Sequence, residues 1–161
     1  MPSETQLVAL NTQIAPAAVA AERATGLPAE ITTAQCIFES GWLTRCPGNN
    51  CFGIKADAHG SGVDYVLTEE FLNGEWEKMP LAFESYNSLA DCFVDHSRLI
   101  TQGAPYAKAW AQYRIDKNWP RLILAIGPIY ATAPGYRISI CNEAGSYYVT
   151  SALQAARSAG A

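Results

Sequence analysis

One glutamate of this sequence stands in an unusual setting for a carboxyl group. Glu39 lies in the segment CIFESGW, beside Phe38 and close to Trp42, near the end of an otherwise apolar stretch. If that stretch is a helix, its last unpaired carbonyl groups and the negative end of its dipole lie beside the carboxyl. The dipole and desolvation by aromatic rings both favour the protonated form. Glu39 is therefore a candidate general acid, although a surface glutamate at a helix end is the plainer alternative.

A second carboxylate would have to come from elsewhere in the chain. The segment DYVLTEEFLNGEWEKMPL contains Glu69, Glu70, Glu75 and Glu77. Alternation along a strand sends Glu69 and Glu70 to opposite faces, so only one of them can face a cleft. Glycosidases generally use two carboxyl groups that flank the scissile bond. One hairpin glutamate thus becomes a candidate partner of Glu39, and ordinary solvated charges remain the alternative.

Other reactive residue types give weaker signals. His96 falls on the apolar face of an expected helix and is interpreted as a core histidine, Ser97 has no evident base, and Cys36 is interpreted as a small core residue. The chain has neither of the glycine-rich phosphate-binding loops, GxxxxGK[ST] and GxGxxG. Its two histidines do not fall at metal-ligand spacing. We therefore expect no cofactor and no metal site.

Two of the five cysteines enclose a short turn-rich loop. Cys46 and Cys51 lie at the ends of CPGNNC. A loop closed so tightly can hold a disulfide in an oxidising compartment, and two unrelated thiols are the alternative. The odd number of cysteines leaves at least one thiol free or bonded to another chain.

The surrounding elements indicate how these residues are positioned. Capping residues, prolines and apolar periodicity predict helices at about residues 3–13, 16–26, 28–40, 88–101, 105–113, 118–130 and 146–158. Residues 64–81 are predicted to form a β-hairpin, because Asn73-Gly74 is a strong type I′ turn signal. The segment after Tyr136 has an ambiguous pattern. The predicted fold class is α+β, with helices around one small hairpin.

Length and composition limit the class of protein. The 161 residues fit one domain, 1–161, and 49% apolar with 16% charged residues is typical of a folded core. A net charge of −4 without a basic run gives no support for a nucleic-acid partner. No apolar stretch approaches a membrane span, so we expect no membrane insertion, and the N-terminus does not have the pattern of a signal peptide.

Five motifs in order resemble one known family. TTAQCIFESGW, NCFGIKA, EFLNGEW, FESYNS and YATAPGY are similar to stretches of the bacterial N-acetylglucosaminidases that cut peptidoglycan, glycoside hydrolase family 73. Together they cover about residues 28–136. The resemblance implies a lysozyme-like fold, with a mainly helical lobe and a small β-hairpin lobe flanking a substrate groove. It also implies cleavage of the β-1,4 bond between N-acetylglucosamine and N-acetylmuramic acid.

The resemblance also implies roles for particular residues. Glu39 matches the catalytic acid, and Glu70, four residues before Gly74, matches the second acidic position. The motif positions give the expected substrate-binding residues, which are Trp42, Asn50, Phe52, Tyr130 and Tyr136. Ala133 departs from the family, which usually has aspartate there.

Several functional alternatives stay open at this point. A muramidase or lytic transglycosylase would cut the neighbouring bond, and a silent wall-binding module would share the fold without the chemistry. A toxin-like effector or a phage lysis enzyme would share the chemistry and differ in biology, and an effector would have an immunity protein as a partner. We expect a monomer that acts on peptidoglycan glycan strands in the periplasm, cell wall or extracellular space.

Overall fold

The computed structural model describes residues 1–56, 63–72, 74–131, 133 and 135–160, with the backbone alone for 63–72 and 76–80. Its helical elements are α1 (Glu4–Ala9), the π-helical η1 (Leu10–Ile14), α2 (Ala15–Thr25), α3 (Ala29–Ser40), η2 (Pro47–Asn49), α4 (Leu89–Gln102), η3 (Ala104–Tyr106), α5 (Ala107–Asp116), α6 (Trp119–Tyr130), α7 (Tyr136–Ala144) and α8 (Tyr147–Ser158). The strands are β1 (Val63–Leu72) and β2 (Glu75–Glu84).

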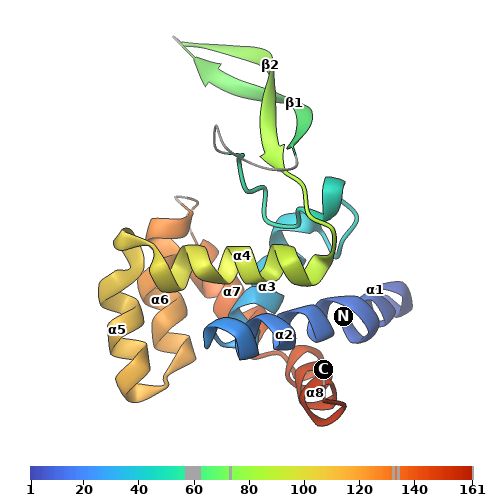
Figure 1. Ribbon diagram of the computed structural model, residues 1–161, viewed down its shortest axis with the longest axis vertical. Helices are drawn as coiled ribbons and strands as arrows, with labels where there is room; N and C mark the ends of the chain where they lie inside the picture. Colours follow the sequence, from blue (N-terminus) through green and yellow to red (C-terminus); the bar gives the residue numbers. More distant parts are fainter. Residues whose placement is uncertain (57–62, 73, 132, 134, 161) are drawn as a thin grey trace.

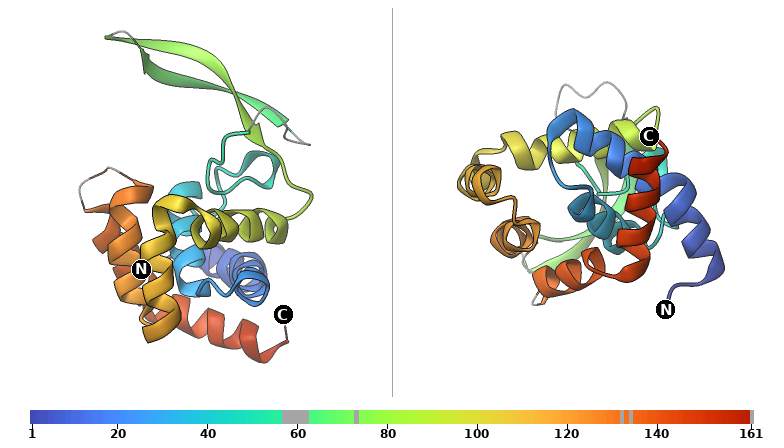
Figure 2. Two further views of the ribbon diagram at one scale, coloured as in Figure 1. Left: turned by 60° about the vertical axis from the view of Figure 1, so that its left-hand side comes forward. Right: turned by 90° about the horizontal axis from the view of Figure 1, so that it is seen from below.

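The helices form one body, and the strands extend away from it. Figure 1 shows α3 near the centre of this body, α4 crossing it, and α5 and α6 side by side at one edge. The left view of Figure 2 shows the ribbon of β1 and β2 again projecting from the helical body. The chain is therefore a mainly helical domain.

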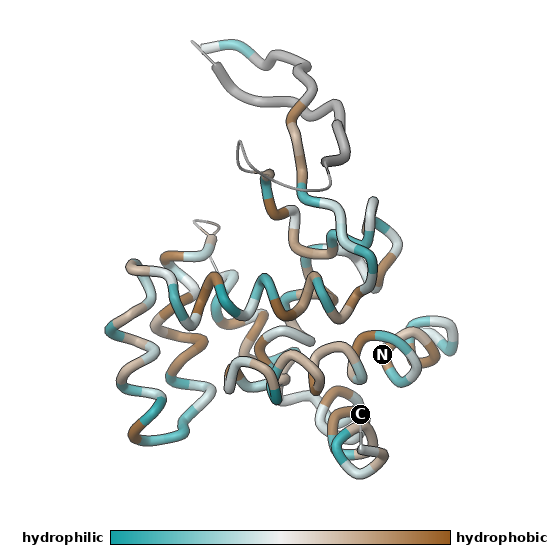
Figure 3. Tube along the Cα trace, in the orientation of Figure 1, coloured by the Kyte–Doolittle hydropathy of each residue, from teal (hydrophilic) through white to brown (hydrophobic). Residues whose placement is uncertain are grey.

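The central helix α3 is buried more completely than its apolar pattern predicts. Polar residues such as Thr32, Thr33 and Gln35 are buried along with the apolar positions. Residues of α3 enter both apolar clusters of the helical body, one with α2, α4 and α8 and one with α4, α6 and α7. Figure 3 shows these apolar residues distributed along the helices of the body. Only the last turn of α3 opens outward, where Phe38 is half exposed.

The first two predicted helices are continuous in the structure. Instead of a break before Pro16, the π-helical turn Leu10–Ile14 joins α1 to α2. Proline lacks an N–H and its ring crowds the carbonyl one turn earlier, and a wider turn accommodates both effects. The capping box of Ser3 and Gln6 that begins α1 is confirmed.

The predicted caps of α4 and α6 are also confirmed. Ser88 accepts a hydrogen bond from Asp91 N at the start of α4, and Asn118 accepts one from Arg121 N at the start of α6. Helix α7 was not predicted. Its N-cap is Gly135, whose φ of 83° is in the left-handed region that favours glycine, and the helix buries Tyr136, Ile140 and Ala144.

The strands pair with each other in an antiparallel register from Val63↔Glu84 to Leu72↔Glu75. Gly74 follows β1 with a φ of 92°, and Asn73, the other residue of the predicted turn, lies outside the described residues. At the base of the ribbon, Ala56 N donates to Ala82 O and Glu84 N donates to Ile54 O. These bonds join the ribbon to the loop that follows α3. The described strands thus form a two-stranded extension of the helical body and no separate packed lobe.

The candidate active site

Glu39 lies in the last turn of α3, as its sequence predicts. Gly41 ends the helix with a φ of 59°, a left-handed conformation that releases the chain into the loop after it. The Glu39 side chain is partly exposed, whereas Ser40 beside it is fully buried. The carboxyl therefore reaches the surface from an otherwise buried helix.

The Glu39 carboxyl is held by a tyrosine from the unpredicted helix α7. Tyr136 Oη donates to Glu39 Oε1 at 2.9 Å, and Gln35 Nε2 donates to the same hydroxyl at 3.3 Å. Gln35 lies one turn before Glu39 on the same face of α3. Burial raises the pKa of Tyr136 well above its usual range, so its hydroxyl stays protonated and acts as a donor to the carboxylate.

Three further rings support Tyr136 from behind. Tyr130 stacks on Tyr136 with ring centroids 5.9 Å apart, and its hydroxyl is 3.2 Å from His96 Nε2. The His96 ring stacks on Phe52 at 3.9 Å. Burial lowers the pKa of His96 to about 3, so this imidazole is neutral at physiological pH. The aromatic chain thus joins α4, α6, α7 and the loop after α3 behind the carboxyl of Glu39.

A pocket of about 170 Å³ opens at Glu39. Its wall is made by the end of α3, the loop after it and the base of β2, and consists of Glu39, Arg45, Pro47, Asn50, Cys51, Phe52, Gly53 and Phe83. A larger groove of about 390 Å³ lies between α5 and α6. The carboxylate that lines that groove, Asp116, forms an ion pair with Arg121 at 2.8 Å. We therefore choose the Glu39 carboxyl as the candidate catalytic group.

The loop that lines the Glu39 pocket is tied down at several points. Cys46 and Cys51 form the predicted disulfide. The Asn50 amide donates to Ile54 O at 2.9 Å and to Glu84 O at 3.0 Å, while its Oδ1 accepts from Ile54 N. Asn49 Nδ2 also donates to Tyr86 O. The loop is thereby fixed to the base of the ribbon and to the segment that leads into α4.

The structure brings most of the predicted site residues together. Asn50 and Phe52 line the pocket with Glu39, and Tyr130 and Tyr136 stand behind the carboxyl. The Asn50 side chain already makes three hydrogen bonds to backbone groups, so its observed contacts shape the loop. Trp42 is placed differently, because it packs against the core cluster and lies 6.0 Å from the ring of Tyr148 in α8.

The predicted partner carboxylate lies on the ribbon. The backbone of Glu70 pairs with Glu77, and that of Glu69 pairs with Lys78. The side chains of both glutamates lie outside the described residues. The assignment of Glu70 therefore stays a prediction.

Sequence reasoning missed three residues of this site. Gln35 stands in the AQ pair of the first motif, and its spacing of four from Glu39 was a usable signal. His96 was interpreted only as a core histidine, yet one of its nitrogens lies against Tyr130 while the other, Nδ1, has no hydrogen-bond partner. Arg45 was not predicted, because a single arginine in a loop has no recognisable sequence pattern. Among the described residues, no cluster of three or more His, Cys, Asp or Glu could hold a metal ion.

The geometry of the site indicates a class of protein. A helical body presents one carboxyl group in an open pocket, holds it with a protonated tyrosine, and backs it with buried aromatic rings. This arrangement is suited to general acid catalysis on a substrate that lies across the surface. No helix in the described part of the chain has both the length and the apolar character needed to cross a bilayer.

The comparisons with known proteins agree with that class. The profile of the glucosaminidase family, described as mannosyl-glycoprotein endo-beta-N-acetylglucosaminidase, matches residues 15–148. The chain therefore belongs to the glucosaminidase family of glycoside hydrolases. The match begins with α2 and ends at the start of α8, so it contains every residue of the pocket.

Individual relatives are similar over most of this chain. A probable N-acetylmuramidase from Lactococcus lactis subsp. cremoris is 34% identical over 85% of the chain and 32% of that protein. The solved glycoside hydrolase domain of Salmonella typhimurium FlgJ has 28% identity and a TM-score of 0.64, with 98% and 99% of the two chains covered. The catalytic domain of the autolysin Auto from Listeria monocytogenes has the same fold, with a TM-score of 0.78 at 21% identity over 94% and 89% of the two chains. The chain spans between 18% and 42% of the length of the curated relatives it matches.

Proposed function

We propose that this chain is a peptidoglycan hydrolase domain that cleaves the β-1,4 bond between N-acetylglucosamine and N-acetylmuramic acid, with Glu39 as the general acid. The observation that carries the proposal is the Glu39 carboxyl, which stands in an open pocket and accepts a hydrogen bond from Tyr136. The names of the relatives, a peptidoglycan hydrolase and an N-acetylmuramidase among them, support peptidoglycan as the substrate.

In this proposal the two oxygens of Glu39 have different tasks. Oε1 accepts the Tyr136 hydrogen bond, so the transferable proton belongs on Oε2. In the proposed reaction, Oε2–H donates to the glycosidic oxygen as the bond to the sugar breaks. The Tyr136 hydroxyl then stabilises the carboxylate that this transfer leaves.

Replacement of Glu39 tests the acid directly. Glu39→Gln keeps the size of the side chain and removes the transferable proton, so we expect wall lysis to fall at least about 100-fold, the low end of acid–base catalysis. Turbidity loss of purified peptidoglycan measures the rate, and circular dichroism verifies that the variant is folded. Wild-type activity in a folded Glu39→Gln protein would refute the assignment.

The second carboxylate is proposed to be Glu70, on the wall of the groove opposite Glu39. The family motif supports it, because the acidic position stands four residues before Gly74. In this proposal the β ribbon flanks the substrate groove, and Glu70 stabilises positive charge on the sugar or positions the attacking water. If the substrate's own acetamido group attacks, Glu70 keeps only a supporting role.

A pair of neighbouring variants tests the face of the ribbon. We expect Glu70→Gln to reduce turnover on purified peptidoglycan while substrate binding persists, and Glu69→Gln to stay near wild type. The reason is that strand alternation predicts opposite faces for consecutive residues. Both rates are measured with folding checked by circular dichroism. A severe defect in Glu69→Gln beside a normal Glu70→Gln would show that the other face is the functional one.

A muramidase is the second candidate, because the Lactococcus relative is named as one. Mass spectrometry of digested peptidoglycan separates the two activities. N-acetylglucosamine at the new reducing ends supports our proposal, and N-acetylmuramic acid supports the alternative. A silent wall-binding module would bind the polymer and release no new ends.

The place of action follows from the proposed substrate. Peptidoglycan lies in the periplasm or the cell wall, and the Cys46–Cys51 disulfide is compatible with an oxidising compartment. The comparisons give no support for an effector role.

A further inference from the structure

We propose that Arg45 binds a carboxylate of the glycan strand beside the scissile bond and so selects acidic over neutral strands. This inference rests on the proposed function, because it names the chemistry that the Glu39 pocket recognises. Arg45 and Glu39 line the same pocket, so a group bound by the arginine lies next to the sugar that receives the proton.

The Arg45 guanidinium is available for a ligand. Its side chain is exposed, and none of the side chains described in the structure forms an ion pair or a hydrogen bond with it. In contrast, Arg121 and Arg157 are both paired with carboxylates of the protein. An unpaired guanidinium in a pocket presents five donors in a planar fork, the geometry that suits a carboxylate.

Contacts of the backbone around Arg45 fix the point from which its side chain projects. Arg45 N donates to Ser40 O at 2.9 Å, and the next residue, Cys46, is held by the disulfide. A Cβ added at Gly41 would lie 3.4 Å from Arg45 Nη2, so the guanidinium lies close over the end of α3. The arginine therefore projects from a fixed backbone position at the end of α3, beside the Glu39 pocket.

The proposed substrate carries the complementary charge. Each N-acetylmuramic acid bears a lactyl ether whose carboxyl group is free in strands without peptides and joined to a stem peptide in intact wall. The stem peptides carry carboxylates of their own. The protein has 15 acidic against 11 basic residues, so its overall charge does not attract such a polymer. A local cation beside Glu39 provides that attraction where the strand must be positioned.

The experiment compares three preparations of one glycan. They are intact peptidoglycan, strands stripped of stem peptides so that the lactyl carboxylates are free, and the same stripped strands with these groups converted to neutral amides. Rates are measured for wild type, Arg45→Gln, Arg45→Lys and the control Arg114→Gln, an exposed arginine of α5. Binding to the same strands is measured in a Glu39→Gln background, so the test does not depend on turnover.

We expect wild type to prefer carboxylate-bearing strands, and Arg45→Gln to lower the ratio of kcat/KM on carboxylated over amidated strands about tenfold, the low end for a hydrogen bond to a charged group. The ratio of binding affinities should fall in parallel. Arg45→Lys should give ratios between those of wild type and Arg45→Gln, because lysine keeps the charge but lacks the planar guanidinium. A preference shown only by stripped strands identifies the lactyl carboxylate, and one shown only by intact wall identifies a stem-peptide carboxylate.

Equal losses on carboxylated and amidated strands, or no loss, would overturn the role of Arg45. A lower melting temperature without a change in selectivity would instead show that Arg45 only stabilises the end of α3. If wild type releases no sugar ends while the binding ratio still depends on Arg45, the proposed hydrolase activity fails and the carboxylate site stands.

Discussion

At the scale of single residues, the Glu39 carboxyl gains its orientation from hydroxyl and amide groups that are largely buried. Gln35 donates to Tyr136, and Tyr136 donates to Glu39, so the tyrosine has a fixed direction for its proton. Neither donor can be replaced by an apolar residue of similar shape without loss of this direction. The orientation of the Glu39 carboxyl therefore depends on α7 as well as on its own helix.

His96 behind this chain gives the stability a specific pH dependence. Its pKa is about 3 in the folded protein, against an ordinary value of 6.5, because burial disfavours the charged imidazolium form. Between these values the unfolded chain binds a proton that the folded chain does not, so stability falls as pH falls from 6.5 toward 3. Between pH 6.5 and 4 this effect reaches at most roughly 3 kcal/mol.

Replacement of His96 should remove that dependence. His96→Phe keeps a ring against Phe52 and eliminates the titration, so its melting temperature should fall less than that of wild type between pH 7 and pH 4. Thermal unfolding followed by circular dichroism at both pH values measures the difference. The carboxylates of the protein titrate in both proteins and cancel in the comparison. Parallel pH profiles would contradict the neutral, buried state of His96.

At the scale of elements, the sequence predicts those helices whose ends carry capping side chains. Ser88 and Asn118 signal α4 and α6, and the structure confirms both. The join of α1 to α2 could not be predicted, because a proline near a helix start indicates a new helix more often than a π-helical turn. Five of the seven proposed site residues, Glu39 among them, lie around the pocket. The sequence could predict them because the motifs coincide with the loop and the helix ends that form the pocket.

Helix α7 shows why the remainder of the site was missed. Its buried residues Tyr136, Ile140 and Ala144 have helical spacing, but the apolar Ile138 is exposed on another side of the helix, so the segment has almost no overall amphipathic character. Its place is set by tertiary packing against α3 and α6. The hydrogen bond from Tyr136 to Glu39 thus depends on long-range contacts that local patterns do not report.

At Gly127, helix α6 lies in close contact with α7. A Cβ there would lie 2.5 Å from Arg137 Cβ and 3.2 Å from its Cα. We expect Gly127→Ala to push α7 away and destabilise the protein by about 1–3 kcal/mol through overpacking, offset in part by the better helix propensity of alanine.

The displacement should also reduce wall lysis, because α7 begins at Tyr136. Thermal unfolding and the turbidity assay measure the two effects, with Ala125→Ser at an exposed position of α6 as the control. A melting temperature at or above that of wild type would show that α7 adjusts freely.

At the scale of the whole molecule, α3 contributes residues to both apolar clusters and also carries Glu39. Ala29, Cys36 and Ile37 belong to one cluster, while Ile31 and Ala34 belong to the other. Burial raises the pKa of the Cys36 thiol to about 12, so this residue is a neutral packing group. Because α3 is buried on nearly all sides, the site at its end is positioned by a closely packed helix.

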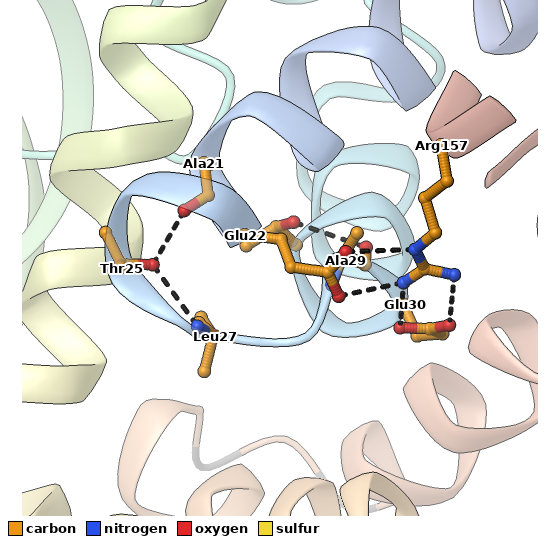
Figure 4. Close-up of polar contacts among 8 residues, drawn as sticks. Ala21, Glu22, Thr25, Leu27, Ala29, Glu30 and Arg157 are labelled. Atoms are coloured by element: carbon orange, nitrogen blue, oxygen red, sulfur yellow. Dashed lines mark hydrogen bonds and ion pairs between the residues drawn. The ribbon is translucent and has the colours of Figure 1, made fainter. Parts of the chain in front are cut away.

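The last helix is joined to this core by a charged cluster that spans the chain. Arg157 of α8 donates through Nε and Nη2 to Glu22 of α2, and through Nη1 and Nη2 to Glu30 of α3, all at 2.8–3.0 Å (Figure 4). Glu22 Oε1 also accepts from Ala29 N, so it orders the turn between α2 and α3. The cluster therefore links α2 and α8 to α3, the helix that bears Glu39.

Loss of Arg157 should destabilise the protein without touching the pocket. Arg157→Met keeps the apolar stem and leaves two like charges unpaired, which we expect to cost about 1–2 kcal/mol, a figure moderated by the 37% exposure of the arginine side chain. For a chain of this size that lowers the melting temperature by roughly 2–8 °C. Arg121→Met, which breaks the exposed pair with Asp116, is the matched control and should change stability by less than about 1 kcal/mol. Thermal unfolding at low and high salt measures both, and wild type should lose more stability in high salt than Arg157→Met does. Equal melting temperatures for the two variants would show that the cluster adds nothing beyond an ordinary surface ion pair.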